Sequence, residues 1–365
     1  RGMKELYFPG TFMIGSDILK KFPEYTSCYG KNYVFIGDTI SLSVSQAALT
    51  ESFVGTDYKY DFIESGKVCC ESEVNRISEM ECVRNADIVC GVGGGGCMDI
   101  ARTIGNKFDK ALVMIVTTAS SDAPCTFMAL TYTDDGSEII YDTRFPKCPD
   151  LVVADSKIIA NAPARLLAAG MGDAIATWYE GKTCRQNPNG IHIAEFAIGM
   201  TELCKEIITA DGLAAYRAVL TKSVTPQLEN VIEANCFLSG IGGLNSGGCA
   251  AGHGIGDWLA GIPGGHSFTH GERVFIGLLI QTVLEEYPME ETISLIKFGR
   301  AVGLPCCIGD MGVEDVKAIA KQAGKELLND HFMVNLCCDH SEDMVEGAIN
   351  YVQYLCDHIV QVERT

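Results

Sequence analysis

The sequence predicts an α/β domain over residues 1–163 followed by an all-α domain over residues 164–365. With 365 residues, the chain is too long for one compact core and suits two domains of ordinary size. Its first part alternates apolar runs with amphipathic segments, and its second part reads as one helix after another. The character of the chain changes near the sequence APAR at residues 162–165, which places the boundary near residue 163.

Four apolar runs in the first part are expected to form a parallel sheet covered by helices on both faces. Continuous apolar strands separated by helical segments are typical of such a sheet. Amphipathic stretches at residues 73–84 and 98–107 predict two of the covering helices. The runs themselves lie at residues 32–36, 86–92, 111–116 and 151–155.

Helices are expected throughout the second part, where strand-like alternation is scarce. Prolines at positions 226, 288 and 305, together with clusters of glycine, mark the breaks between helical segments. The clearest helical segments lie at residues 191–209, 226–240, 271–286 and 313–323.

Composition narrows the classes of function. Hydrophobic residues make up 47% of the chain and charged residues 21%, as in soluble globular proteins. The formal net charge of −19 disfavours nucleic acid, anionic membranes and heavily phosphorylated substrates as partners. No apolar run reaches the roughly 20 residues that span a bilayer, and the start RGMKELYFPG lacks the apolar stretch of a secretion signal. With 17 cysteines and no CxxC motif, the chain is expected to be a reduced, cytoplasmic protein.

A glycine-rich turn follows the second apolar run. Residues 91–99 read GVGGGGCMD and precede a helical segment. Glycines let the backbone approach a pyrophosphate, and a helix N-terminus offers it free N–H groups, so this turn predicts a dinucleotide site. A flexible turn without a ligand is the alternative, because glycine marks tight turns generally.

Asp38 ends the first apolar run, where a carboxylate can accept hydrogen bonds from an adenosine ribose. It precedes the glycines, whereas the common dinucleotide fingerprint has its acidic residue about 20 residues after them. The order is therefore not the usual one, and a turn or cap aspartate is the alternative.

Asp173, His253 and His270 are predicted to bind a metal ion. Each lies among small residues, which leave room for a ligand, and the chain has only seven histidines. Two imidazoles and one carboxylate leave a position open for substrate, as in catalytic zinc sites. A buried, neutral structural role is the alternative for each histidine. His266 lies in a glycine-rich stretch that reads as a loop, and we expect it to be a substrate-side or structural residue.

Several motifs occur in the order that one enzyme family shows. The glycine turn with Asp99 comes first, followed by TTASSDAPC at residues 117–125 and AGMGDA at residues 169–174. The later motifs are KSVTP at residues 222–226, EAN at residues 233–235 and HGERV at residues 270–274. From about residue 8 to about residue 325, the chain resembles the glycerol dehydrogenases, within the iron-containing alcohol dehydrogenase and dehydroquinate synthase-like superfamily.

The resemblance implies a dehydroquinate synthase-like fold, with an α/β N-terminal dinucleotide-binding domain and an all-α C-terminal metal-binding domain. It implies Zn²⁺ bound by Asp173, His253 and His270, with Asp122 as a further catalytic residue that binds the polyol. It also implies the oxidation of glycerol to dihydroxyacetone with NAD, in a homo-oligomer that in this family is often an octamer. The expected NAD-binding residues are Asp38, Gly94, Gly95, Gly96, Cys97, Met98, Asp99, Thr117, Thr118, Ala119, Ser120, Thr126, Met128 and Tyr132.

Three positions depart from the patterns of the superfamily. Thr177 stands where iron-type alcohol dehydrogenases have a further histidine, which favours zinc. Gly96 stands where glycerol dehydrogenases have a lysine, so a cation worth about 1–3 kcal/mol near the phosphates is missing and NAD affinity and cofactor choice are in question. Gly256 stands where the family often has another histidine, so the substrate is open among glycerol, another vicinal diol, an α-hydroxy ketone and an aldehyde.

Two other hypotheses stay open. A dehydroquinate synthase-like or glycerol-1-phosphate dehydrogenase-like enzyme needs basic residues for a phosphate or phosphonate, and the sequence has no clear basic cluster. A non-catalytic homologue that binds nucleotide or metal is the second hypothesis. It is disfavoured because all three metal ligands are retained, and an unneeded buried site leaves costly unpaired polar groups.

Overall fold

The computed structural model describes residues 5–186 and 193–362, which belong to two compact units. The first, here called the sheet unit, comprises Tyr7–Ala164 and Arg217–Ile241. The second, the helical unit, comprises Arg165–Tyr216 and Gly242–Thr365 together with the start of the chain. Residues 217–241 follow the boundary near residue 163 that the sequence indicates, and they pack with the sheet.

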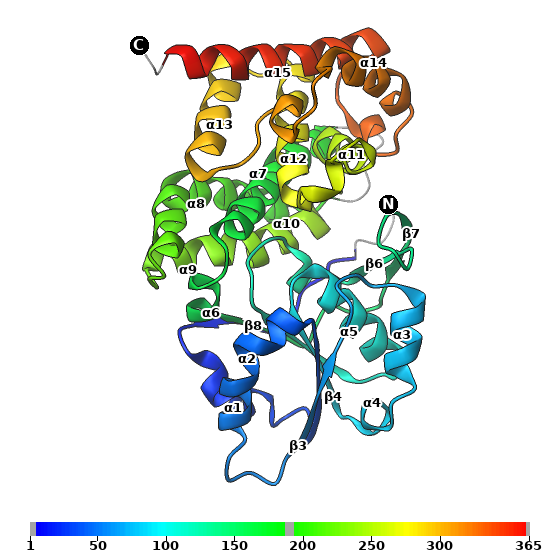
Figure 1. The fold of residues 1–365 in the computed structure, drawn as a ribbon, viewed down its shortest axis with the longest axis vertical. Coiled ribbons are helices and arrows are strands. Elements are labelled where there is room, and N and C mark those ends of the chain that lie inside the picture. Colours follow the sequence, from blue (N-terminus) through cyan, green and yellow to red (C-terminus); the bar gives the residue numbers. More distant parts are fainter. Residues whose placement is uncertain (1–4, 187–192, 363–365) are drawn as a thin grey trace. The chain divides into compact units, whose positions relative to one another are not determined.

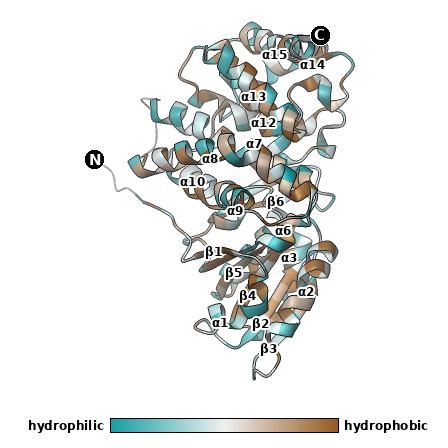
Figure 2. Ribbon diagram, turned by 90° about the vertical axis from the view of Figure 1, so that its left-hand side faces the viewer, coloured by the Kyte–Doolittle hydropathy of each residue, from teal (hydrophilic) through white to brown (hydrophobic). Residues whose placement is uncertain are grey.

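The sheet unit is built on six parallel strands in the order β1-β8-β5-β4-β2-β3 (Figure 1). Its four central strands are the four apolar runs of the sequence, which confirms the predicted parallel sheet. Nearly every residue in them is buried, because helices cover both faces, and they are mainly hydrophobic (Figure 2). The strands are β1 (Phe12–Gly15), β2 (Asn32–Gly37), β3 (Lys59–Glu64), β4 (Ile88–Gly93), β5 (Ala111–Val116) and β8 (Leu151–Asp155).

The edge strands β1 and β3 were not among the predicted strands: β1 is an apolar segment of only four residues, FMIG, and β3 mixes apolar with polar residues. In β3, only Ile63 is buried, and the other positions alternate between exposed and half-buried. The residues of β1 are all half-buried. An edge strand has a neighbouring strand on one side only, so it tolerates polar residues, as β3 does.

The chain reverses its course across the sheet at β2, which has β3 on one side and β4 on the other. Ligands of open parallel sheets bind at the carboxyl ends of the strands that flank such a reversal. Gly37 is aligned with Val92, and Gly93 with Val116, so these strand ends are level. Helices α2 (Thr39–Ser52) and α5 (Gly95–Lys107) begin at this edge, directly after β2 and β4.

The remaining elements of the sheet unit are short. The amphipathic stretch at residues 73–84 forms two helices rather than one, because the chain breaks between them at Glu79 and Met80. An antiparallel hairpin, β6–β7, follows β5. These elements are α1 (Phe22–Thr26), α3 (Glu71–Ser78), α4 (Glu81–Asn85), β6 (Met128–Tyr132), β7 (Ile139–Arg144), α6 (Ser156–Ala160) and α9 (Pro226–Glu233).

The helical unit contains no strand within its described residues, which confirms its predicted class. The predicted helix at residues 191–209 corresponds to α8, although positions 191 and 192 lie outside the described residues. The predicted helix at residues 226–240 is instead α9, one π-helical turn (Ala234–Leu238) and α10. The helices are α7 (Ala164–Gln186), α8 (Glu195–Leu220), α10 (Ser239–Asn245), α11 (Ala251–Trp258), α12 (His270–Leu284), α13 (Met289–Val302), α14 (Val316–Leu327) and α15 (Glu342–Val362).

Among the described residues, no helix has the length and apolar character required to cross a bilayer.

Glycines allow three helices of the helical unit to approach one another closely. A Cβ atom on Gly277 of α12 would lie 2.1 Å from the carbonyl oxygen of Gly252 in α11. A Cβ atom on Gly271 would lie 2.0 Å from the carbonyl oxygen of Ala169 in α7. Because neither glycine has a side chain, α12 packs directly on the backbones of α11 and α7.

Replacing Gly271 with alanine is expected to destabilise the helical unit by about 1–3 kcal/mol, because the added methyl group has backbone rather than a flexible side chain in its way. The temperature of unfolding and the amount of bound metal should both fall, since the added methyl group would also lie 3.2 Å from the Cβ atom of Asp173. Gly199→Ala in α8 is the matched control, because a Cβ atom there meets nothing within 4 Å. An equal stability for both variants would contradict this packing.

Candidate metal centre and nucleotide site

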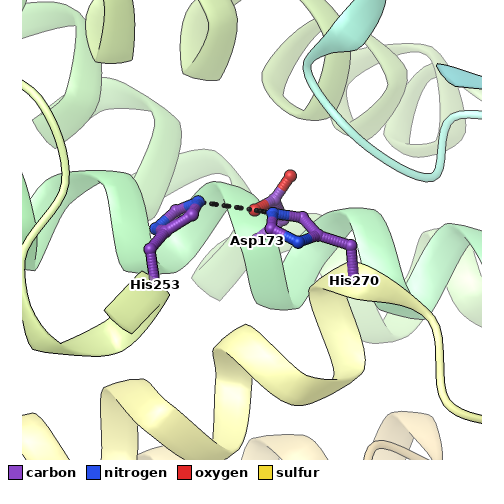
Figure 3. Close-up of side chains that lie close together, drawn as sticks. All are labelled: Asp173, His253 and His270. Carbon is purple, nitrogen blue, oxygen red and sulfur yellow. Dashed lines mark ion pairs between the residues drawn. The ribbon is translucent and has the colours of Figure 1, made fainter. Parts of the chain in front are cut away.

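Asp173, His253 and His270 come together in the helical unit, each from a different helix (Figure 3). Asp173 lies on α7, His253 on α11, and His270 is the first residue of α12. The Nε2 atoms of both histidines lie 3.5 Å from Oδ1 of Asp173. One ligand atom from each residue lies within 4.8 Å of the other two.

The start of α12 is fixed by the sequence around His270. Thr269 caps the helix and exchanges hydrogen bonds with Glu272, whose Oε2 accepts the Thr269 N–H at 2.8 Å. Arg165 holds the same carboxylate through two hydrogen bonds of 2.6 and 2.7 Å. His266 is exposed, in a short 3-10 turn before this cap. The capping box therefore fixes the place at which the His270 side chain leaves the backbone.

Glu180 is a site residue that the sequence analysis misses. Its Oε2 lies 2.5 Å from Nδ1 of His253, and its Oε1 accepts the backbone N–H groups of Ala250 and His253 at 2.8 Å each. With Nδ1–H donating to Glu180, Nε2 of His253 presents its lone pair toward Asp173. Glu180 follows Asp173 by seven residues in α7, which is about two helical turns, so helical periodicity puts both on one face. That spacing is the signal that would have found it.

His270 has a carboxylate partner of its own. Its Nδ1 lies 3.7 Å from Oδ1 of Asp257, and its side chain is 40% exposed. Both histidines thus have a carboxylate beside the ring nitrogen that faces away from Asp173. Metal-binding histidines are commonly oriented in this way.

The electrostatics of the trio favour positive charge beside Asp173. Burial alone would raise the pKa of Asp173, but the facing His270 and His253 rings outweigh it and hold that pKa well below its usual value. Burial would lower the pKa of His253, but Cys249, Glu180 and Asp173 raise it well above the usual value. The pKa of His270 is likewise raised, against its burial, by Asp173.

These residues fit a divalent metal ion. Two imidazole nitrogens and a carboxylate oxygen form the donor set of many catalytic zinc sites, and both nitrogens converge on one oxygen of a carboxylate that is 3% exposed. The hydroxyl of Thr177 donates a hydrogen bond to the carbonyl oxygen of Asp173 at 3.3 Å. It is thus directed at the backbone and adds no ligand to this set.

Replacing Glu180 with glutamine is expected to weaken metal binding by about 10–100-fold, which is typical when the partner of a metal-binding histidine is changed. The neutral amide cannot stabilise the Nδ1–H tautomer as a carboxylate does. Competition with a chromophoric chelator measures the affinity. Glu202→Gln, at an exposed position of α8, is the control, and equal affinities for the two variants would refute the orienting role of Glu180.

Several of the residues predicted to bind a nucleotide lie together at the reversal point of the sheet. Gly94 precedes α5 and lies beside Thr118 and Ser120: a Cβ atom on it would be 3.4 Å and 3.8 Å from their hydroxyl oxygens. Those two hydroxyls are themselves 3.4 Å apart. The N–H of Thr117 donates to the carbonyl oxygen of Gly93 at 3.3 Å. The ends of β4 and β5 thus line the N-terminus of a 13-residue helix, where an anion is favoured.

Asp38 is both a helix cap and a neighbour of the glycine turn. Its Oδ1 accepts the N–H of Ser41 at 2.8 Å, which caps α2, and the Cys97 thiol lies 3.5 Å from its Oδ2. Asp38 can therefore cap α2 and still lie beside the glycine turn, where a ribose-binding residue is expected. Asp38 and the turn meet even though 50-odd residues separate them along the chain, because β2 and β4 are neighbours.

Gly96 is required by its surroundings. A Cβ atom on it would lie 2.0 Å from the carbonyl oxygen of Lys67, which is backbone and has no flexible end to move. The lysine that glycerol dehydrogenases have at this position therefore has no room in this chain.

Asp99 and the residues beyond it belong to a buried network. Asp99 accepts hydrogen bonds from Arg102 at 2.5 Å and from the N–H of Leu130 at 3.2 Å, and the side chain of Met98 is fully buried. Arg102 also donates to the carbonyl oxygens of Ala123 at 2.5 Å and Met128 at 2.7 Å. Arg102 thereby ties α5 to the segment that carries the predicted residues Asp122, Thr126 and Met128.

The other predicted residues of this segment have structural contacts of their own. Thr126 accepts the N–H of Met128 at 3.1 Å, Ala119 accepts a hydrogen bond from the side chain of Asn235 at 3.0 Å, and Tyr132 donates its N–H to Cys69 at 2.8 Å. Asp122 precedes a short 3-10 turn in the sheet unit, whereas the three predicted metal ligands belong to the helical unit.

Gly256 lies at a packing contact within the helical unit. A Cβ atom on it would lie 2.9 Å from the backbone of Val274, so this position faces α12. The glycine allows α11 and α12 to pack together, and a histidine side chain would not fit there.

Comparison with known proteins gives concordant results. Residues 13–163 match the family described as iron-containing alcohol dehydrogenase. Glycerol dehydrogenases of Escherichia coli O6:H1 and Thermotoga maritima are each 36% identical to the chain, over 85% and 87% of its length and 85% and 88% of theirs.

Solved structures agree with the sequence comparisons. A probable glycerol dehydrogenase from Sinorhizobium meliloti has a TM-score of 0.88 and 31% identity, over 98% of this chain and 100% of its own. Glycerol dehydrogenase from Schizosaccharomyces pombe has a TM-score of 0.91 and 26% identity, over 100% and 94%. The expected fold class is thus confirmed.

Proposed function

Because this chain belongs to the glycerol dehydrogenases of the iron-containing alcohol dehydrogenase family and is an oxidoreductase acting on polyols, we propose that it oxidises a vicinal diol with NAD and Zn²⁺. Glycerol, with dihydroxyacetone as its product, is the proposed substrate. The convergence of Asp173, His253 and His270 on one point, with Glu180 behind His253, is the observation that carries this proposal.

Asp173, His253 and His270 would hold the zinc ion. When bound, Zn²⁺ supplies a Lewis acid that lowers the pKa of a substrate hydroxyl. Glu180 keeps the Nδ1 proton of His253, so that Nε2 stays available as a ligand. Because the His270 side chain is partly exposed, the proposed zinc position is accessible from solvent. In this proposal, Asp122 binds a further hydroxyl of the polyol.

The sheet unit would hold NAD, which accepts the hydride from the secondary carbon when bound. The N-terminus of α5 and the glycines at positions 94 and 95 would take the pyrophosphate, as helix N-termini do for other dinucleotides. Asp38 would accept hydrogen bonds from the adenosine ribose, and its negative charge would disfavour the 2′-phosphate of NADP. Thr117, Thr118, Ser120, Thr126, Met128 and Tyr132 complete the proposed cofactor contacts.

A diol panel tests the proposal. Purified protein is analysed for bound metal and then assayed with glycerol, 1,2-propanediol and a simple monoalcohol, with NAD and NADP in parallel. We expect zinc, NAD reduction with the diols, and loss of activity after chelation that Zn²⁺ restores. Full activity after complete removal of metal, or no cofactor reduction with any polyol or hydroxy ketone, would overturn it.

We further propose a cytoplasmic homo-oligomer, following the acidic, cysteine-rich composition and the family resemblance. Light scattering coupled to size-exclusion chromatography measures the assembly, for which an octamer is the expected result. Cell fractionation measures the location.

A further inference from the structure

His253 also belongs to a second group of ligand-type side chains, in which the Glu180 carboxylate faces Nδ1, the ring nitrogen away from Asp173. Glu180, Cys249 and His253 offer an oxygen, a sulfur and a nitrogen atom that lie within 4.8 Å of one another. The Cys249 thiol interacts directly with the His253 ring. Asp173 and His270 take no part in this group, which we call the thiol triad.

The backbone around Cys249 is firmly held. Its carbonyl oxygen accepts a hydrogen bond of 2.8 Å from the side-chain amide of Asn335 and a longer contact of 3.6 Å from the Cys184 thiol. The neighbouring N–H of Ala250 donates to Glu180 at 2.8 Å. The peptide group that follows Cys249 is therefore fixed, and this keeps the residue beside His253 and Glu180.

We propose that the thiol triad is a second cation position, selective for thiophilic ions such as Cd²⁺ or excess Zn²⁺, and that an ion bound there inhibits the enzyme. Sulfur and imidazole nitrogen together select soft or borderline ions over Mg²⁺ and Ca²⁺, which take oxygen ligands. The position is distinct from the Asp173–His253–His270 site, although His253 belongs to both. The inference goes beyond the proposed function, because ion binding at the triad requires no substrate or cofactor.

Binding follows a simple proton balance. The Cys249 thiol and Nδ1 of His253 each lose one proton to solvent as the metal–sulfur and metal–nitrogen bonds form, and no redox change occurs. Oε2 of Glu180 now lies 2.5 Å from Nδ1 of His253, so the two atoms must move apart to accept an ion between them.

Inhibition is the consequence of that movement. The hydrogen bond from His253 to Glu180 is lost, and with it the contact that orients His253 toward Asp173. Removing such a contact typically costs a catalytic metal about 10–100-fold in affinity.

The test is a Cd²⁺ titration of the zinc-loaded protein, comparing the wild type with Cys249→Ser and with Cys28→Ser. Cys28 is an exposed thiol of the sheet unit and serves as the matched control. Equilibrium dialysis counts bound ions, and ultraviolet absorption detects cadmium–thiolate bonds. We expect the wild type and Cys28→Ser to bind one ion more than Cys249→Ser, and Cys249→Ser to resist inhibition by at least about 10-fold.

A second measurement uses the unaltered protein. Iodoacetamide labelling followed by peptide mass spectrometry should show Cys249 protected by Cd²⁺ and Cys28 not protected. The same Cd²⁺ stoichiometry and absorption in Cys249→Ser, or Cys249 labelling that Cd²⁺ leaves unchanged, would overturn the inference. Dialysis and labelling do not depend on catalysis, so their outcome is separate from that of the diol panel.

Discussion

Asp173→Asn is expected to lose its bound metal and to lower kcat/KM for a diol by about 1000-fold or more, which is about 4 kcal/mol of lost stabilisation in the transition state. Asparagine has nearly the same shape as aspartate, so the packing of α7 should survive. The neutral amide removes the negative charge that both Nε2 atoms face at 3.5 Å. Elemental analysis and initial rates measure the two effects.

The control for Asp173→Asn is Asp343→Asn, which makes the same chemical change at an exposed position of α15. It should keep metal content and activity. Retention of full activity by Asp173→Asn would show that this carboxylate is not part of the reacting site. Loss of activity with zinc still bound would assign Asp173 a role other than metal binding.

Arg102→Met is expected to destabilise the sheet unit by about 3–5 kcal/mol, the typical cost of removing one partner of a buried ion pair. Arg102 is fully buried and pairs with Asp99, whose pKa burial already raises to about 6 despite that pairing. Without the guanidinium, Asp99 would be buried as an unpaired carboxylate, and the carbonyl oxygens of Ala123 and Met128 would lose a donor. Amide hydrogen exchange of α5 measures the change in the free energy of opening.

Arg144→Met is the control for Arg102→Met, because Arg144 pairs with Asp142 at the surface with 72% of its side chain exposed. Surface pairs contribute about 0–1 kcal/mol, so little change is expected. Arg102→Lys should recover only part of the loss, because one ammonium group cannot reproduce the forked geometry. Equal protection of α5 in all variants would show that the network does not support this unit.

The central strands were predictable because burial on both faces requires apolar side chains along their whole length. The edge strand β3 was not, since its partly exposed residues carry no such requirement, and β1 is an apolar segment of only four residues. The break at Glu79 and Met80 and the π-helical turn at Ala234–Leu238 leave the hydrophobic pattern nearly unchanged. Boundaries of this kind depend on tertiary packing.

The three candidate metal ligands were predictable from the sequence, but Glu180, the carboxylate that orients His253, was not. Asp173, His253 and His270 are the residue types that bind metal, and motif order pointed to them. Glu180 looked like an ordinary helical glutamate, although its seven-residue distance from Asp173 put it on the same face. Gly96 and Gly256 have no room for a side chain because backbone atoms of Lys67 and Val274 lie beside them. Neither neighbour is close in sequence, so no local pattern showed this.

The return of residues 217–241 to the sheet unit bears on how this chain can be divided. Glu229 accepts a hydrogen bond from Ser156 at 2.8 Å, and the ring of Phe237 lies 5.2 Å from that of Phe12. A polypeptide ending at residue 163 would therefore leave the apolar surfaces of β1 and α6 uncovered. One cut does not separate the units, since the chain passes between them near residues 6, 164, 216 and 241. A self-sufficient nucleotide-binding fragment would instead have to join residues 7–164 to residues 217–241 through a new linker.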